Sequence, residues 1–130
     1  MDKFLLCKID QLATVENGVA KTLEVAPISQ EGRTLLALRP IADTLGAKTL
    51  WDPATQTATI IHGESTLKIT VGKPFMTREI YGRSETIPLE APAKIISERT
   101  VFPLRSVAAA FDMEVVYEPQ DRSICISSHK

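Results

Sequence analysis

One stretch of the sequence occurs twice, and this internal repetition constrains the fold more than any other feature. Residues 32–47, "GRTLLALRPIADTLGA", return sixty-six positions later as "ERTVFPLRSVAAAFDM", residues 98–113, and the alignment needs no gap. Upstream, "NGVAKTLEVAP" aligns with "YGRSETIPLEAP" after shifts of one or two residues. Identical pairs at this offset are Arg33 with Arg99, Thr34 with Thr100, Leu38 with Leu104 and Arg39 with Arg105. We therefore expect two tandem repeats of about 65 residues, roughly residues 1–65 and 66–130, because repeated sequence forms repeated local structure.

Each copy carries one helical pattern. Apolar residues recur at the i, i+3, i+4 and i+7 spacing of a single helix face: Leu38, Ile41, Ala42 and Leu45 in the first copy, and Leu104, Val107, Ala108 and Phe111 in the second. Pro40 and Pro103 suit the opening turn, whose N–H groups lack a helical partner anyway. Gly46 is a left-handed C-cap for the first helix, and Asp112 stands in the matching place of the second. We expect one helix of about nine residues in each copy.

The remaining segments read as strands. "KTLW" and "TATII" flank the turn signal "DPATQ", and "EVVY" and "SICIS" flank "EPQDR", so each copy predicts a hairpin after its helix. Between the two helical stretches, "STLKITVG" predicts a strand and "FMTREIYGRSETIPL" a hairpin that turns at Gly82. The predicted fold class is therefore α+β, with mainly antiparallel strands and two short helices. A chain of 130 residues suits a single domain spanning residues 1–130.

Composition excludes several classes of partner. Fifteen basic and sixteen acidic residues give a formal net charge of −1, so we expect no nucleic-acid binding. The apolar start "FLLC" is too short for a membrane span or a secretion signal, so we expect no membrane insertion. Cys7 and Cys125 could form one bridge, but one pair is no disulfide framework, and we expect two ordinary strand residues.

Motifs for catalysis or metal binding are not found in the sequence. It contains no G-x-S-x-G elbow, no glycine-rich phosphate loop and no Cys/His pair at a useful spacing. Asp52 and Glu118 could be drawn as a general acid and base, but they stand at turn entrances, where such residues commonly cap turns. His62 and His129 are isolated and lack the spacing of metal ligands. We expect a protein that is not an enzyme and has no cofactor or metal.

A known family shares the repeated pattern. The stretches "GRTLLALRPIADTLGAKTLWDPATQTATI" and "ERTVFPLRSVAAAFDMEVVYEPQDRSICI" resemble the copper amine oxidase N-terminal domain-like family, also called the stalk domain family. Its pattern is Arg-Thr, two apolar residues, Pro-Leu-Arg, a short helix ending in Leu-Gly-Ala, an apolar run to Trp-Asp, a turn and a strand, stated twice. Ala37 departs from this pattern where Pro103 keeps the proline, and "FDM" replaces Leu-Gly-Ala in the second copy. The resemblance covers nearly the whole chain.

The resemblance implies a location and excludes a copper site. Such domains are common in secreted and cell-surface proteins of spore-forming Gram-positive bacteria, which implies an extracellular or cell-envelope location. The chain shows no signal peptide, so a cytoplasmic location stays open. Copper amine oxidase chemistry needs three histidine ligands and a tyrosine that matures to a quinone, in a different domain. Tyr81 lacks the Asn-Tyr-Asp/Glu context of that tyrosine, and its place at a hairpin turn favours ordinary packing.

Three repeat-equivalent pairs are the candidate structural residues: Arg39 and Arg105, Asp52 and Glu118, and Trp51 and Tyr117. Each arginine precedes its acid by thirteen residues, so we expect its guanidinium to bond nearby backbone carbonyls or that acid. The alternative is that both arginines bind a ligand. Trp51 and Tyr117 are either a paired sugar-binding platform or side chains that close the edge of the core, and we expect the latter. The mixed charges of Arg78, Glu79, Arg83 and Glu85 favour a solvated hairpin tip.

The expected function is that of a non-catalytic structural or binding module. It would serve as a spacer, display or attachment domain of a bacterial secreted or surface protein, with a cell-wall polymer or other domains of the parent protein as partners. The alternative is a glycan- or peptidoglycan-binding module, which a rim of exposed aromatic residues would favour. The ligand, the neighbouring domains and the oligomeric state stay open at this point.

Overall fold

The computed structural model describes residues 3–128. Within this range the chain forms fourteen strands and two helices. In chain order they are β1 (Phe4–Lys8), β2 (Ala13–Glu16), β3 (Val19–Thr22), β4 (Ile28–Gln30), β5 (Arg33–Ala37), α1 (Leu38–Leu45), β6 (Lys48–Asp52), β7 (Thr57–His62), β8 (Ser65–Thr70), β9 (Phe75–Ile80), β10 (Arg83–Pro88), β11 (Lys94–Ile96), β12 (Arg99–Pro103), α2 (Leu104–Ala110), β13 (Met113–Glu118) and β14 (Ser123–Ser128).

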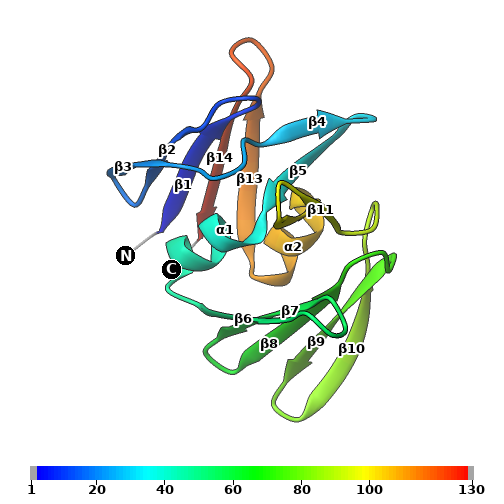
Figure 1. The fold of residues 1–130 in the computed structure, drawn as a ribbon. Helices are drawn as coiled ribbons and strands as arrows, with labels where there is room; N and C mark the ends of the chain where they lie inside the picture. The colour runs from blue at the N-terminus through cyan, green and yellow to red at the C-terminus, as the bar shows by residue number, and fades with distance from the viewer. Residues whose placement is uncertain (1–2, 129–130) are drawn as a thin grey trace.

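The strands form three antiparallel sheets. The terminal sheet has the order β13-β14-β1-β2-β3, the middle sheet β10-β9-β8-β7-β6, and the connecting sheet β11-β12-β5-β4. In Figure 1 both helices lie between the terminal sheet and the middle sheet, and the connecting sheet stands beside them. The predicted α+β class, mainly antiparallel with two short helices, is confirmed. All three predicted hairpins are also present, as β6–β7, β13–β14 and β9–β10.

The sheets join segments that are distant in sequence. β1 pairs with β14, so that Phe4 lies opposite Ser127 and the two ends of the described chain are neighbours. In the connecting sheet, β5 pairs with β12, and the central pair of that register is Leu36 with Phe102. Both side chains of this pair are fully buried. The sheet order therefore holds the first and second halves of the chain together through long-range strand pairing.

The main core fills the space between the two five-stranded sheets. Its fully buried members come from every layer: Leu5 and Ile126 from the terminal sheet, Ile60 and Leu67 from the middle sheet, and Ile41 and Val107 from the helices. The apolar stripe predicted for α1 is buried along its whole length. In α2, three of the four predicted positions are buried, and Phe111 lies just past the helix end and packs against the core from its rim. A second, smaller cluster lies in the connecting sheet around Val25, Leu35, Ala37 and Val101.

The two helices end in different turns because the residues that follow them differ. Gly46 adopts φ 74°, and the Ala47 amide donates to the Ala42 carbonyl at 2.8 Å, which closes α1 with a left-handed turn. The second copy has no glycine there, so α2 ends in a tighter turn in which Phe111 donates to Ala108 at 3.1 Å. Asp112 then takes the left-handed conformation at φ 55°. The helices have eight and seven residues, slightly fewer than predicted.

The two cysteines are free and face opposite sides of the terminal sheet. Cys7 lies opposite Ile124, whereas Cys125 lies opposite Leu6, and paired residues of an antiparallel ladder share a face. A bridge would therefore require the strands to rotate. Burial raises the pKa of the Cys7 thiol to about 12, with the nearby Cys125 as the smaller cause. Both cysteines are ordinary strand residues, as predicted.

Candidate functional site

A groove of about 560 Å³ opens beside the start of α1. Its walls come from α1, the edge strand β6, the strand β12 and the segment before β4. We call it the first groove, and it is lined by Glu24, Ala37, Leu38, Arg39, Thr49, Leu50, Trp51, Ala58, Ile95, Glu98, Arg99 and Thr100. A second groove, of about 290 Å³, opens beside the start of α2 and is lined by ten residues.

The two grooves contain corresponding residues. Each residue that lines the second groove lies sixty-six positions from a residue that lines the first. The pairs are Glu24 with Glu90, Leu38 with Leu104, Arg39 with Arg105, Thr49 with Val115, Trp51 with Tyr117, Ala58 with Ile124, Ile95 with Ser29, Glu98 with Gly32, Arg99 with Arg33 and Thr100 with Thr34. Each groove thus combines an aromatic ring, an arginine on the first helical turn, an Arg-Thr pair from a strand, and a glutamate.

Trp51 and Tyr117 are partly exposed, which corrects the expectation that they close the core. Their exposed fractions are 45% and 40%. Trp51 pairs with the buried Ala58 and therefore shares the inner face of the middle sheet, as Tyr117 shares that of the terminal sheet with Ile124. Both rings stand on edge strands, β6 and β13, at the margin of the core. Because each ring lies at the margin of the core and beside a groove, part of its surface is in contact with solvent.

The predicted bond between each arginine and its acid is not formed. Within residues 3–128, Arg39 and Arg105 make no hydrogen bond or ion pair, and both side chains are exposed. Asp52 Oδ1 instead accepts a hydrogen bond from the Ala54 amide at 3.0 Å, and Glu118 Oε1 accepts one from the Gln120 amide at 3.0 Å. These acids cap their own turns, because an amide two residues away is the nearest donor. The turn-capping interpretation of the two acids is confirmed.

Other basic side chains bond the backbone where the helices end. Lys3 Nζ donates to the Leu45 carbonyl at 2.9 Å, and Arg78 Nη1 donates to the Ala110 carbonyl at 2.9 Å. Arg78 also pairs with Glu85 across the β9–β10 hairpin, and only 27% of its side chain is exposed. The expectation of a solvated hairpin tip therefore holds for Glu79, Arg83 and Glu85, which are exposed, and was wrong for Arg78. Cations are favoured at helix C-termini, but no local pattern shows which distant residue will reach one.

The strand arginines of the grooves are engaged, in contrast to the helix arginines. Arg99 donates to the Glu24 carboxylate, and this hydrogen bond lowers the pKa of Glu24 and raises that of Arg99. Arg33 lies 3.7 Å from the Glu31 carboxylate. The helix arginine of each groove therefore has its N–H groups available for hydrogen bonds, although the charge of Arg39 also acts on Glu24.

Comparison with known families decides the identity of the chain. The model of the copper amine oxidase N-terminal domain matches residues 15–126, a range that contains every residue lining either groove. The chain belongs to the copper amine oxidase N-terminal domain family. This domain is a non-catalytic accessory part of those oxidases. Neither the curated proteins nor the solved structures gave a match.

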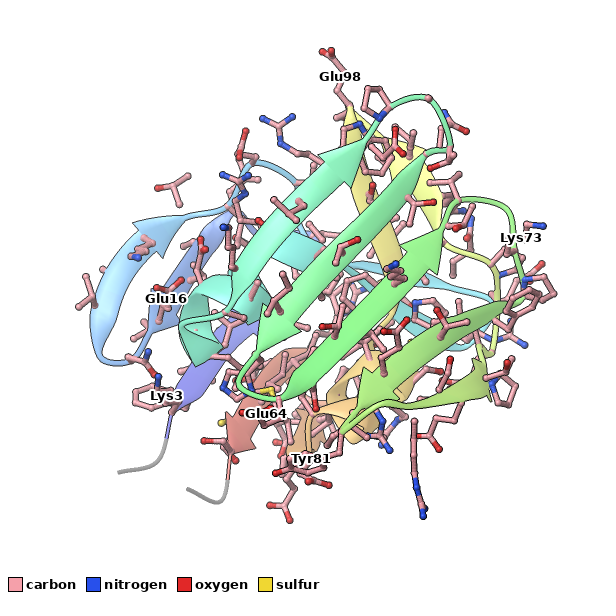
Figure 2. All side chains as sticks on the ribbon, turned by 90° about the horizontal axis from the view of Figure 1, so that it is seen from below. Lys3, Glu16, Glu64, Lys73, Tyr81 and Glu98 are labelled. Carbon is pink, nitrogen blue, oxygen red and sulfur yellow. The ribbon has the colours of Figure 1, made fainter. Side chains whose placement is uncertain are left out.

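The described side chains that are capable of metal or redox chemistry lie apart from one another. Among the residues described, no three His, Cys, Asp or Glu side chains gather where they could hold a metal ion. His62 packs edge-on against the Phe111 ring, with centroids 6.0 Å apart, and His129 lies outside the described residues. Tyr81 is 77% exposed at the β9–β10 turn (Figure 2), so the expectation that it packs was wrong. No helix in residues 3–128 is long and apolar enough to cross a membrane.

Proposed function

We propose that this protein is a non-catalytic binding module that attaches a bacterial secreted or surface protein to a polysaccharide of the cell envelope. The observation that carries the proposal is the placement of Trp51 and Tyr117. Each ring is partly exposed in a groove beside an arginine that makes no hydrogen bond or ion pair with the described residues. Sugar-binding sites need flat aromatic surfaces in contact with solvent, and an aromatic ring with one polar neighbour suits such a surface. The bacterial surface location rests on the family resemblance.

We infer that the domain consists of two tandem repeats that fold as one unit. Strands β4 and β11, and strands β5 and β12, begin and end at the same offset of sixty-six residues. Left-handed backbone recurs at the same offset: Glu31 with Ser97, Gly32 with Glu98, Gly46 with Asp112, and Gln56 with Arg122. Non-glycine residues seldom adopt this conformation, so its recurrence supports a shared backbone. Each five-stranded sheet takes strands from both proposed repeats, which supports one domain for the whole chain.

The arrangement of the chain ends favours attachment over spacing. β1 and β14 are neighbours in the terminal sheet, so the chain enters and leaves the fold at adjacent points. A spacer that extends the reach of a parent protein needs its connections at opposite ends. In Figure 1 the start of β1 and the end of β14 lie on one side of the molecule, which supports the proposal of an attachment module.

Co-sedimentation with insoluble cell walls of a Gram-positive bacterium tests this function. We expect the protein to pellet with the walls, and the double variant Trp51→Ala, Tyr117→Ala to stay in solution. Tyr81→Ala is the matched control, because Tyr81 is an exposed aromatic residue outside both grooves. Failure of the parent protein to pellet, or equal pelleting of the double variant, would contradict the proposal.

A further inference from the structure

We propose that the grooves select acidic saccharides, with the sugar ring stacked on the groove's aromatic residue and its carboxylate bound by Arg39 in the first groove or Arg105 in the second. This inference rests on the proposed function and names its ligand class. It also predicts that the first groove binds the ligand more tightly than the second, because the first groove is the larger of the two and carries the indole ring.

The first groove has room for a ring beside Trp51. The indole pairs across the ladder with Ala58, and Ala37 lines the same groove, so two small side chains stand where larger ones would fill the space. One face of a pyranose ring presents C–H groups with slight positive charge, which are attracted to the negative face of an aromatic system. The 45% exposure of Trp51 leaves indole surface available for this contact.

Arg39 is the group in the first groove that can hold an anion. Arg99 donates to Oε2 of Glu24, so one arginine and one glutamate of the groove are paired with each other. Arg39 and Glu98 are the other charged residues of the lining, and the Glu98 side chain extends away from the body of the protein in Figure 2. Arg39 lies on the first turn of α1 and has a planar guanidinium that makes no hydrogen bond or ion pair with the residues described, although its charge attracts Glu24 from beyond ion-pair distance. A guanidinium binds a carboxylate through two parallel N–H···O bonds, whereas a neutral hydroxyl offers no matching pair of acceptors.

The second groove also contains an arginine and an aromatic ring, but its volume is smaller than that of the first groove. Ile124 replaces Ala58, Val115 replaces Thr49, and Tyr117 replaces Trp51. The branched Ile124 side chain occupies volume that the alanine leaves open, in agreement with a groove of about 290 Å³ against about 560 Å³. The first groove should therefore bind the same ligand more tightly.

Calorimetric titration with galacturonic acid oligomers and with their carboxyl-reduced, neutral counterparts tests the inference. We expect the acidic oligomer to bind more tightly than the neutral one. Arg39→Gln should weaken binding of the acidic oligomer by about tenfold or more, since a hydrogen bond to a charged group is lost. Arg105→Gln should have a smaller effect. Arg83→Gln is the matched control, because it makes the same change of charge at an exposed position outside both grooves.

The outcomes separate this inference from the proposed function. Equal binding of acidic and neutral oligomers, with no effect of Arg39→Gln, would overturn the acidic selection while wall attachment stands. Tighter binding of a glycerol phosphate polymer than of the galacturonic acid oligomers would overturn it as well, since that polymer has no sugar ring to stack. Binding of neither sugar, together with no pelleting on cell walls, would overturn both proposals. Amide spectra of each variant verify that it is folded.

Discussion

Replacing Phe102 by alanine should destabilise the protein more than most single substitutions. Phe102 has no exposed surface, and it lies at the centre of the β5–β12 register opposite Leu36, which is also fully buried. Truncating such a phenylalanine removes its transfer free energy and leaves a cavity, at a cost of about 3–5 kcal/mol. The free energy of unfolding of an ordinary domain is only about 5–15 kcal/mol, so the loss is large. Urea denaturation followed by circular dichroism measures it.

A control and a double-mutant cycle make this prediction specific. Phe75→Ala removes the same side chain from a position that is 39% exposed, so it should cost no more than about 2 kcal/mol. The milder pair Phe102→Leu and Leu36→Val keeps the double variant folded, and we expect a coupling energy of about 1 kcal/mol between two residues in contact. A loss below about 1 kcal/mol for Phe102→Ala, with additive effects in the cycle, would refute the central role of this pair.

Three further predictions concern thiol ionisation, helix capping and the proposed repeats. The pKa of the Cys7 thiol is about 12 in the folded protein and 9.0 in the unfolded chain, so the stability that the neutral thiol contributes is complete below pH 9 and is lost as the pH rises toward 12. Urea unfolding should show the free energy of unfolding of the parent protein falling, by up to about 1.4 kcal/mol per pH unit, relative to that of a Cys7→Ala variant. The same pH dependence in both proteins would contradict this prediction. Gly46→Ala should lower the free energy of unfolding by about 1–2 kcal/mol, because alanine is strained at φ 74° and its Cβ would lie 3.3 Å from Lys3 Nζ. Gly63→Ala is the control: its Cβ would meet open space, so its loss of stability measures the backbone strain alone. A fragment of residues 1–66 should show poor amide dispersion and no cooperative thermal transition, because it lacks β14 beside β1 and β12 beside β5; a sharp transition in a monomeric fragment would argue for independently folding repeats.

The local structure was predictable from the sequence because its signals are local. The apolar stripe that begins at Leu38 and the capping residue Gly46 both lie within α1 or next to it, and the structure confirms them. The turn signal after Asp52 likewise predicted the β6–β7 hairpin. In each case the residues that determine the conformation are neighbours in the chain, so no knowledge of the tertiary structure was needed.

The site required information that the local pattern does not contain. The sequence predicted that Trp51 closes the edge of the core beside a turn, but only the order of strands in the sheet shows that β6 is an edge strand. An inner-face residue in a central strand is buried, and the same residue at an edge is partly exposed. The contacts of Lys3 and Arg78 with helix ends depend on residues 42 and 32 positions away, which no local spacing identifies.

The fluorescence of Trp51 tests the account most directly, because the chain has one tryptophan and it lies in the first groove. Titration with galacturonic acid oligomers should change its emission saturably, with a midpoint equal to the calorimetric Kd. The midpoint should move to about tenfold higher concentration in Arg39→Gln and stay in place in Arg83→Gln. Unchanged Trp51 emission during binding that calorimetry detects would place the ligand outside the first groove and contradict the account.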